Sequence, residues 1–282
     1  MMKILETPRD AMQGLDHFIP TNDKVKLIQG LLDVGFDIID AGSLVSSKAI
    51  PQLQDTCKVI EQLDISSTRS ELFVLVANIK GGEQASKMEQ LKYIGFPFSF
   101  SETFLKRNIN SNLNQAESTV YHLQEISVMS GKKLMVYLTM AFGNPYGDPC
   151  NLDLILEWTE KFHLAGIKTV SLSDIIGIAT PEQISSTYYN LTKAFPTIEF
   201  GMHLHIKKDD WYDKIKAAYA NGCKIFDGVI NGMGGCPMTG FEMVKNLPTS
   251  NLLQYAQLNK ISLPIDIKKF EVAQQLAVEI LI

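Results

Sequence analysis

The chain has 282 residues, of which 45% are hydrophobic and 20% charged, a balance that is typical of a globular protein and excludes extensive disorder. Its net charge of -5 and its pI of about 5.6 exclude an electrostatic preference for nucleic acid or for an anionic membrane surface. No stretch offers the roughly 18 apolar residues of a membrane span, and the four cysteines form no CxxC pair, so we expect neither a membrane segment nor a disulfide framework.

Short apolar runs that predict buried parallel strands alternate with amphipathic stretches that predict helices. In chain order, the eight predicted strands are Lys3–Glu6, Asp37–Ala41, Leu72–Ala77, Gly95–Ser101, Leu134–Met140, Thr169–Asp174, Glu199–His205 and Lys224–Ile230. The predicted helices between them include Asn22–Val34, Leu113–Met129, Leu152–Leu164, Pro181–Ala194 and Trp211–Ala220. Thr180 followed by Pro181 is typical of a helix start, and Gly35 lies where a helix is expected to end.

Eight strand-helix repeats favour a (β/α)8 TIM barrel over a doubly wound open sheet, although both folds use buried parallel strands. The barrel is preferred because polar side chains gather at the carboxyl ends of several predicted strands, where a barrel places its active site. These side chains are Asp10, Asp40, Ser43, Asn78, Asp174 and His205. We therefore predict a single barrel domain over residues 1–282, with a glycine-rich active-site loop and additional C-terminal helices.

His203 and His205 alternate at the end of the seventh predicted strand, so both imidazoles face the same side. A lone histidine on such a run is usually a satisfied core group, but two at this spacing suit one divalent cation. Asp10, after the first strand, is the carboxylate that could join them. Its neighbour Arg9 offers a planar fork of donors suited to a developing enolate oxygen, although the pair is also compatible with a surface salt bridge.

Gly232-Met233-Gly234-Gly235-Cys236-Pro237 follows the eighth predicted strand and forms either a loop that closes over a ligand or a simple turn. Cys236 at its tip is a better candidate for proton transfer than the other three cysteines. Asn246, which we expect in a loop, could add an amide oxygen to the metal ligands or act only as a turn residue.

Taken in order, the motifs PRD, SLSDIIGIATP, HLH, and GMGGCP followed by NLPTSNL resemble the 3-hydroxy-3-methylglutaryl-CoA lyases of the DRE-TIM metallolyase superfamily. Further similar stretches are DAGSLVSSKAIPQ, SETFLKRNIN and GNPYGDP, so the resemblance runs through nearly the whole chain.

The resemblance implies Mg²⁺- or Mn²⁺-assisted cleavage of 3-hydroxy-3-methylglutaryl-CoA to acetyl-CoA and acetoacetate. By position it assigns the metal to Asp10, His203, His205 and Asn246, and catalysis to Arg9, Cys236 and Asp174. We expect substrate contacts from Gln13, Asp40, Ser43, Lys48 and Asn108, with Lys48 and Asn108 placed to meet the phosphates of CoA. The resemblance also suggests a homodimer that binds an acyl-CoA, and we expect a cytoplasmic form because no transit peptide precedes the first strand.

Three positions depart from the family pattern: Asp40 where relatives commonly carry glutamate, Ile206 to Asp209 after the HLH motif, and Ser250 where glutamate is frequent. None of these departures removes a proposed metal ligand. Two alternatives stay open, which are an aldolase or acyl-CoA condensing enzyme of the same superfamily and a barrel that binds acyl-CoA without catalysis.

Overall fold

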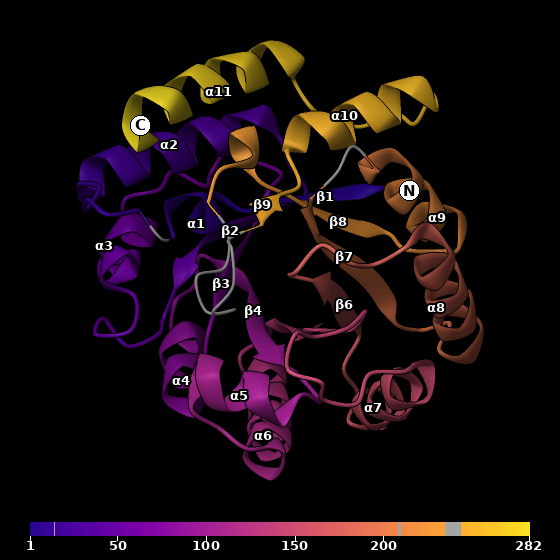
Figure 1. Cartoon of the computed structure of the whole chain (residues 1–282). Coiled ribbons are helices and arrows are strands. Elements are labelled where there is room, and N and C mark those ends of the chain that lie inside the picture. The colour runs from indigo at the N-terminus through magenta and orange to yellow at the C-terminus, as the bar shows by residue number, and fades with distance from the viewer. Residues whose placement is uncertain (14, 208–209, 235–243) are drawn as a thin grey trace.

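Eight parallel strands form the wall of a closed barrel in the computed structural model, which describes residues 1–13, 15–207, 210–234 and 244–282 (Figure 1). Each strand pairs with the next along the chain, and β8 pairs with β1. The strands are β1 (Lys3–Glu6), β2 (Ile38–Ser43), β3 (Glu71–Leu75), β4 (Leu91–Phe98), β5 (Lys133–Leu138), β6 (Thr169–Asp174), β7 (Glu199–Ile206) and β8 (Ile225–Gly228). The predicted (β/α)8 barrel is thus confirmed, and the open sheet is excluded.

The predicted strands β1 and β6 have the observed bounds, whereas β4 begins at Leu91 instead of Gly95. Lys92 interrupts the apolar pattern near the start of β4, and because of this charge the hydrophobic pattern did not predict the first residues of the strand. A ninth strand, β9 (Lys245–Asn246), pairs antiparallel with β7. Asn246 therefore lies in a strand and not in the expected loop, because pairing with a distant strand overrides its weak intrinsic preference for β structure.

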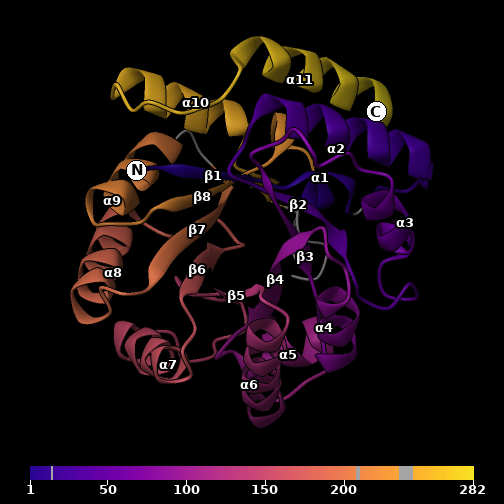
Figure 2. The same ribbon diagram turned by 180° about the vertical axis from the view of Figure 1, so that it is seen from behind.

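Helices surround the barrel, as the two opposite views in Figures 1 and 2 show. They are α1 (Pro8–Met12), α2 (Thr21–Val34), α3 (Thr56–Glu61), α4 (Ile79–Ser86), α5 (Glu102–Ile109), α6 (Leu113–Met129), α7 (Leu152–Leu164), α8 (Pro181–Ala194), α9 (Trp211–Ala220), α10 (Thr249–Leu258) and α11 (Ile267–Leu281), with short 3-10 helices η1 (Pro51–Leu53) and η2 (Ile230–Gly232). Helices α6 to α9 have the predicted bounds, and α2 begins one residue earlier than predicted.

The predicted helix signals act as expected. The Thr180 side chain accepts a hydrogen bond from the Gln183 backbone amide, and the Gln183 side-chain oxygen accepts one from the Thr180 backbone amide, which completes a capping box. Gly35 ends α2 with a left-handed φ of 88°.

The predicted C-terminal helices are confirmed as α10 and α11. Helix α11 packs beside α2 in both views, and the Phe36 and Phe270 rings meet edge to face with centroids 6.1 Å apart. Among the described residues, no helix combines the length and the apolar composition that a membrane crossing needs.

Two layers of apolar side chains determine which residues reach the mouth of the barrel. The larger core lies between the strands and the helices. A smaller cluster fills the barrel interior and consists of Leu5, Ile38, Phe73, Tyr93, Met135, Tyr137 and Ile225. Because side chains alternate across a strand, residues two positions beyond this interior cluster also face inward, at the carboxyl ends of the strands.

Candidate active site

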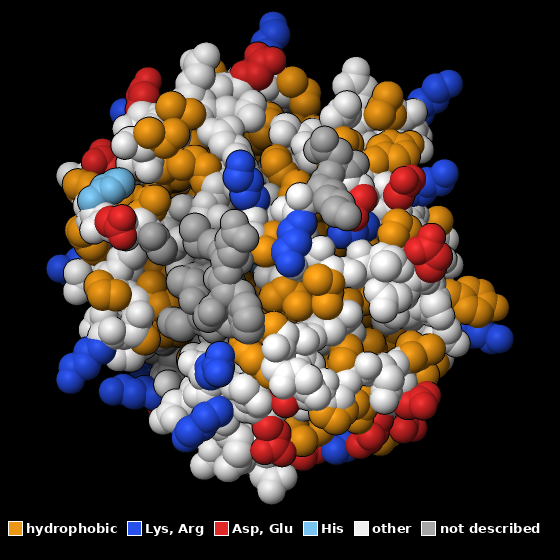
Figure 3. All heavy atoms as spheres, in the orientation of Figure 1, with side chains coloured by type: hydrophobic (Ala, Val, Ile, Leu, Met, Phe, Trp, Pro, Cys, Tyr) orange, Lys and Arg blue, Asp and Glu red, His pale blue; other side chains and the backbone are white. Residues whose placement is uncertain are grey.

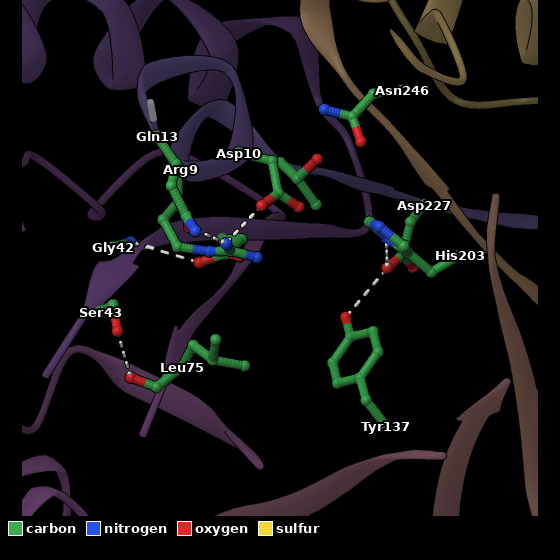
Figure 4. Close-up of polar contacts among 12 residues, drawn as sticks. Arg9, Asp10, Gln13, Gly42, Ser43, Leu75, Tyr137, His203, Asp227 and Asn246 are labelled. Atoms are coloured by element: carbon green, nitrogen blue, oxygen red, sulfur yellow. Dashed lines mark hydrogen bonds and ion pairs between the residues drawn. The ribbon is translucent and has the colours of Figure 1, made fainter. Parts of the chain in front are cut away.

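Arg9 lies at the centre of a cluster of polar side chains at the barrel mouth (Figure 4). Its short helix α1 follows β1 directly, so the end of the strand determines where the guanidinium stands. The Nε atom donates to Asp40 Oδ2 at 2.7 Å, and Nη1 donates to Gln13 Oε1 at 2.9 Å and to Asp10 Oδ1. Three side chains thus hold one cation in a single orientation.

The electrostatics around Arg9 favour its charged form. Burial alone would lower the pKa of Arg9, but the carboxylates of Asp10 and Asp40 outweigh that effect and raise it. Burial raises the pKa of Asp40, which is fully enclosed, while Arg9 opposes the rise. The guanidinium therefore stays positive at the barrel mouth, where it can stabilise a developing negative charge.

His203 and His205 stand on β7 with their imidazoles facing each other, and their Nε2 atoms are 3.2 Å apart. His205 Nδ1 lies 2.9 Å from the carbonyl oxygen of Val244, and His203 Nδ1 lies 3.0 Å from Asp227 Oδ2. A carbonyl and a carboxylate oxygen can only accept, so we assign the Nδ1 proton to each neutral ring. Both Nε2 lone pairs then face each other, an unfavourable contact that a shared proton or a cation would relieve.

Burial and the neighbouring His203 lower the pKa of His205 to about 4, so its ring is neutral at pH 7 and free to act as a ligand. Burial alone would lower the pKa of His203 as well, but the hydrogen bond and charge of Asp227 raise it. The Tyr137 hydroxyl donates to the same oxygen of Asp227 at 3.0 Å. This chain of contacts fixes the orientation of the His203 ring.

Asn246 supplies a further donor atom beside the histidines. Strand β9 pairs Asn246 with His205, and its amide nitrogen donates to the Met233 carbonyl at 2.8 Å. Its Oδ1 is buried without a hydrogen-bond partner among the described residues, and Figure 4 shows this oxygen turned toward the side of the site where His203 lies. A buried amide oxygen left without a donor is costly, and a cation would satisfy it.

The residues present fit a divalent cation by the chemistry of their donor atoms, which are two imidazole nitrogens with converging lone pairs and an unpartnered amide oxygen. Across the described parts of the chain, no three or more His, Cys, Asp or Glu side chains are grouped so as to hold a metal ion. The carboxylate of Asp10, the fourth proposed ligand, is paired with Arg9 through its Oδ1 atom.

A cavity of about 450 Å³ opens beside these groups. Six of the residues to which the sequence assigned a metal, catalytic or substrate role line this cavity: Arg9, Asp10, Gln13, Asn108, His203 and His205. Apolar side chains such as Leu75, Pro97, Phe104 and Ile175 form much of the remaining wall. The combination of an apolar cavity with a few convergent polar groups is typical of a small-molecule site.

The other predicted site residues lie elsewhere. Asp40 supports Arg9 through their ion pair, Ser43 donates to the Leu75 carbonyl at 3.0 Å, and Lys48 is exposed. On the face seen in Figure 3, Lys and Arg side chains are scattered singly and form no continuous patch. Cys236 lies outside the described residues.

Asp174 does not reach the cavity. Ser173, its neighbour on β6, lines the cavity, so strand alternation turns Asp174 toward the helices. Its two carboxylate oxygens accept from the backbone amides of Ile178 at 3.0 Å and Ala179 at 2.8 Å. Asp174 thereby orders the loop after β6, and its catalytic role stays a prediction.

Sequence reasoning missed Asp227, Tyr137 and Ser173. Each lies inside an apolar run that predicts a strand, and we interpreted those runs as core. The available signal was alternation: Asp227 is two positions beyond the interior residue Ile225, and Ser173 lies in register with His203 on the adjacent strand.

Comparison with known proteins places this geometry in a family. The model of the family described as HMGL-like matches residues 2–277. A mitochondrial hydroxymethylglutaryl-CoA lyase of Bos taurus is 28% identical over 237 residues, which are 84% of this chain and 72% of that protein. A hydroxymethylglutaryl-CoA lyase of Bacillus subtilis is 29% identical over 230 residues, or 82% of this chain and 76% of that protein.

Solved structures agree with this comparison. The HMG-CoA lyase structure from Bacillus subtilis superposes with a TM-score of 0.92 at 26% identity and covers 99% of this chain and 93% of that one. The HMG-CoA lyase from Brucella melitensis gives a TM-score of 0.89 at 27% identity, with 99% and 98% of the two chains covered.

Proposed function

Because the chain belongs to the HMGL-like family, we propose that it is a divalent-metal-dependent carbon-carbon lyase that cleaves 3-hydroxy-3-methylglutaryl-CoA to acetyl-CoA and acetoacetate. The names of the relatives support the substrate. The observation that carries the proposal is the pair of converging Nε2 atoms of His203 and His205, which face the same cavity as Arg9. The proposal takes residues 1–282 as one barrel domain.

We assign the metal, Mg²⁺ or Mn²⁺, to Asp10, His203, His205 and Asn246. When bound, the cation supplies Lewis-acid polarisation of the hydroxyl and carboxylate oxygens of the substrate. Asp227 and the Val244 carbonyl keep the protons of both histidines on Nδ1, so both Nε2 lone pairs stay available.

Arg9 is proposed to stabilise the electron sink, which is the thioester carbonyl of the substrate. In the cleavage, a general base takes the proton of the tertiary hydroxyl, the bond between C2 and C3 breaks, and the electron pair of that bond moves onto the thioester as an enolate. C3 becomes the ketone of acetoacetate. The guanidinium, held by Asp40 and Gln13, stabilises the enolate oxygen without having to reorient during the reaction.

Cys236 is the proposed donor of the proton that converts the enolate to acetyl-CoA, an assignment that rests on the sequence motif. For Asp174 we propose an indirect role in catalysis, in which its carboxylate orders the loop after β6.

Substrate contacts are proposed for Gln13 and Asn108 on the cavity wall and for Asp40 through Arg9. Ser43 and Lys48 are proposed from their positions in the sequence. A homodimer and a cytoplasmic location complete the proposal and rest on the resemblance to the family.

A substrate comparison tests the proposal. Purified chain with Mg²⁺ or Mn²⁺ is expected to release acetoacetate from 3-hydroxy-3-methylglutaryl-CoA and to leave a 4-hydroxy-2-oxo acid intact. Turnover of the oxo acid alone would indicate an aldolase, and binding of the CoA thioester without turnover would indicate a non-catalytic barrel. Cleavage that is unaffected by both Cys236→Ala and His205→Ala would contradict the assigned mechanism.

A further inference from the structure

Ser173 carries a buried hydroxyl that has no hydrogen-bond partner within the described part of the chain. Its side chain is 1% exposed, at the carboxyl end of β6, and it lines the cavity. Seven buried side-chain nitrogen or oxygen atoms among the described residues lack a partner, and Ser173 Oγ is the one whose residue lines this cavity. A buried hydroxyl without a partner is unfavourable in the fold, so it points to an acceptor that arrives with a ligand.

Two neighbours of Ser173 in the cavity wall form no hydrogen bond with its hydroxyl. Thr139, on the adjacent strand side of the cavity, already donates its hydroxyl to the Phe98 carbonyl at 2.8 Å, and Ile175 is apolar. On the other side, Ser173 lies in register with His203, so its hydroxyl stands next to the proposed metal ligands.

We infer that Ser173 donates a hydrogen bond to the terminal carboxylate of the substrate's acyl group and so selects dicarboxylic acyl-CoA thioesters, an inference that rests on the proposed function. Arg9 follows β1, and two strands, β7 and β8, separate β1 from β6. Because Arg9 and Ser173 thus lie on separate parts of the barrel mouth, we assign them to different oxygens of one acyl group. Arg9 is assigned to the thioester oxygen. A carboxylate has two oxygens with several lone pairs, so it can bind a cation and still accept from Ser173.

Ser171 provides a matched control. It lies two positions earlier on β6, has the same inward orientation and also carries a buried, unpartnered hydroxyl, but it does not line the cavity. Removing an unpartnered hydroxyl costs little stability, so both Ser171→Ala and Ser173→Ala are expected to keep the wild-type unfolding midpoint.

Two non-reacting probes test the inference by calorimetry with Mn²⁺ present: glutaryl-CoA, which has the terminal carboxylate, and butyryl-CoA, which lacks it. Ser173→Ala is expected to weaken glutaryl-CoA binding about tenfold or more, as loss of a hydrogen bond to a charged group predicts, and to leave butyryl-CoA binding unchanged. Ser171→Ala is expected to leave both affinities unchanged.

Equal effects of Ser173→Ala on the two thioesters, or no effect on either, would overturn the inference. A lower unfolding midpoint for Ser173→Ala than for Ser171→Ala would also overturn it, because the hydroxyl would then serve the fold. The lyase proposal stands apart from this test: selective loss of glutaryl-CoA binding in a chain that cleaves no substrate would support Ser173 and refute the lyase. Cleavage of 3-hydroxy-3-methylglutaryl-CoA by a chain in which Ser173→Ala weakens the binding of neither thioester, or of both equally, would support the lyase and refute the role of Ser173.

Discussion

Glu6 is a buried carboxyl group whose replacement by Gln should change how stability depends on pH. Strand alternation turns Glu6 away from the interior residue Leu5 and toward the helices, where it is 0% exposed. Its Oε1 accepts from the Ile230 amide at 2.7 Å, and its Oε2 lies 2.5 Å from the Thr249 hydroxyl. These contacts tie β1 to η2 and to the start of α10.

Burial raises the pKa of Glu6 from 4.5 to about 8, although the bonds from Thr249 and Ile230 oppose the rise. Between these two values the unfolded chain releases the proton while the folded chain keeps it, so stability falls as pH rises. At about 1.4 kcal/mol per pH unit, Glu6 lowers the free energy of unfolding by roughly 2–3 kcal/mol between pH 5 and pH 7. Gln cannot ionise; its Oε1 can accept from the Ile230 amide, and its Nε2 can donate to the Thr249 hydroxyl oxygen.

Urea unfolding of the wild type and of Glu6→Gln at pH 5, 6 and 7 measures this effect. The difference in unfolding free energy between the two proteins should move in favour of Gln by roughly 2–3 kcal/mol across that range, because other titrating groups cancel in the comparison. Glu6→Ala, which also cannot ionise but leaves the Ile230 amide unpaired, should be about 2–4 kcal/mol less stable than Glu6→Gln at every pH. A difference between wild type and Glu6→Gln that stays constant with pH would refute the raised pKa.

Two further predictions concern the site itself. Asp227→Ala should lower Mn²⁺ affinity about 10- to 100-fold in calorimetry, because His203 loses the partner that orients its ring. Tyr137→Phe, which keeps the Asp227 carboxylate, should lower the affinity less. Unchanged Mn²⁺ affinity in a folded Asp227→Ala protein would contradict the orienting role of Asp227. Arg9→Lys keeps the charge but loses the planar fork that contacts Asp40 and Gln13, so kcat should fall about 100-fold while Mn²⁺ affinity changes little. A wild-type kcat would exclude the proposed stabilisation of the enolate oxygen by Arg9.

Strand and helix periodicity predicted the barrel and the bounds of β1, β6 and helices α6 to α9, because each βα unit carries its own hydrophobic pattern. Helix α8, for example, has both its predicted bounds and its predicted Thr180 cap. Strand β9 could not be predicted in this way. Its two residues become a strand through pairing with β7, a contact between segments far apart in the chain.

The site was predicted in part for a similar reason. Residue type, spacing and position in the sequence were enough to predict His203, His205 and Arg9 as site residues, and the structure places all three around one cavity. Asp227 has apolar neighbours in the sequence, and its role is visible only in its contact with His203, which lies on the adjacent strand. Asp174 shows the opposite case, since its position at a strand end suggested the cavity but alternation along β6 turns it away.

Metal-dependent formation of both products tests the central claim most directly. Chain stripped with a chelator and dialysed should form no acetyl-CoA or acetoacetate from 3-hydroxy-3-methylglutaryl-CoA, and added Mn²⁺ should restore both products in equal amounts in the wild type but not in His205→Ala. Absence of both products from the Mn²⁺-loaded wild type, or undiminished cleavage by the stripped chain, would contradict the account.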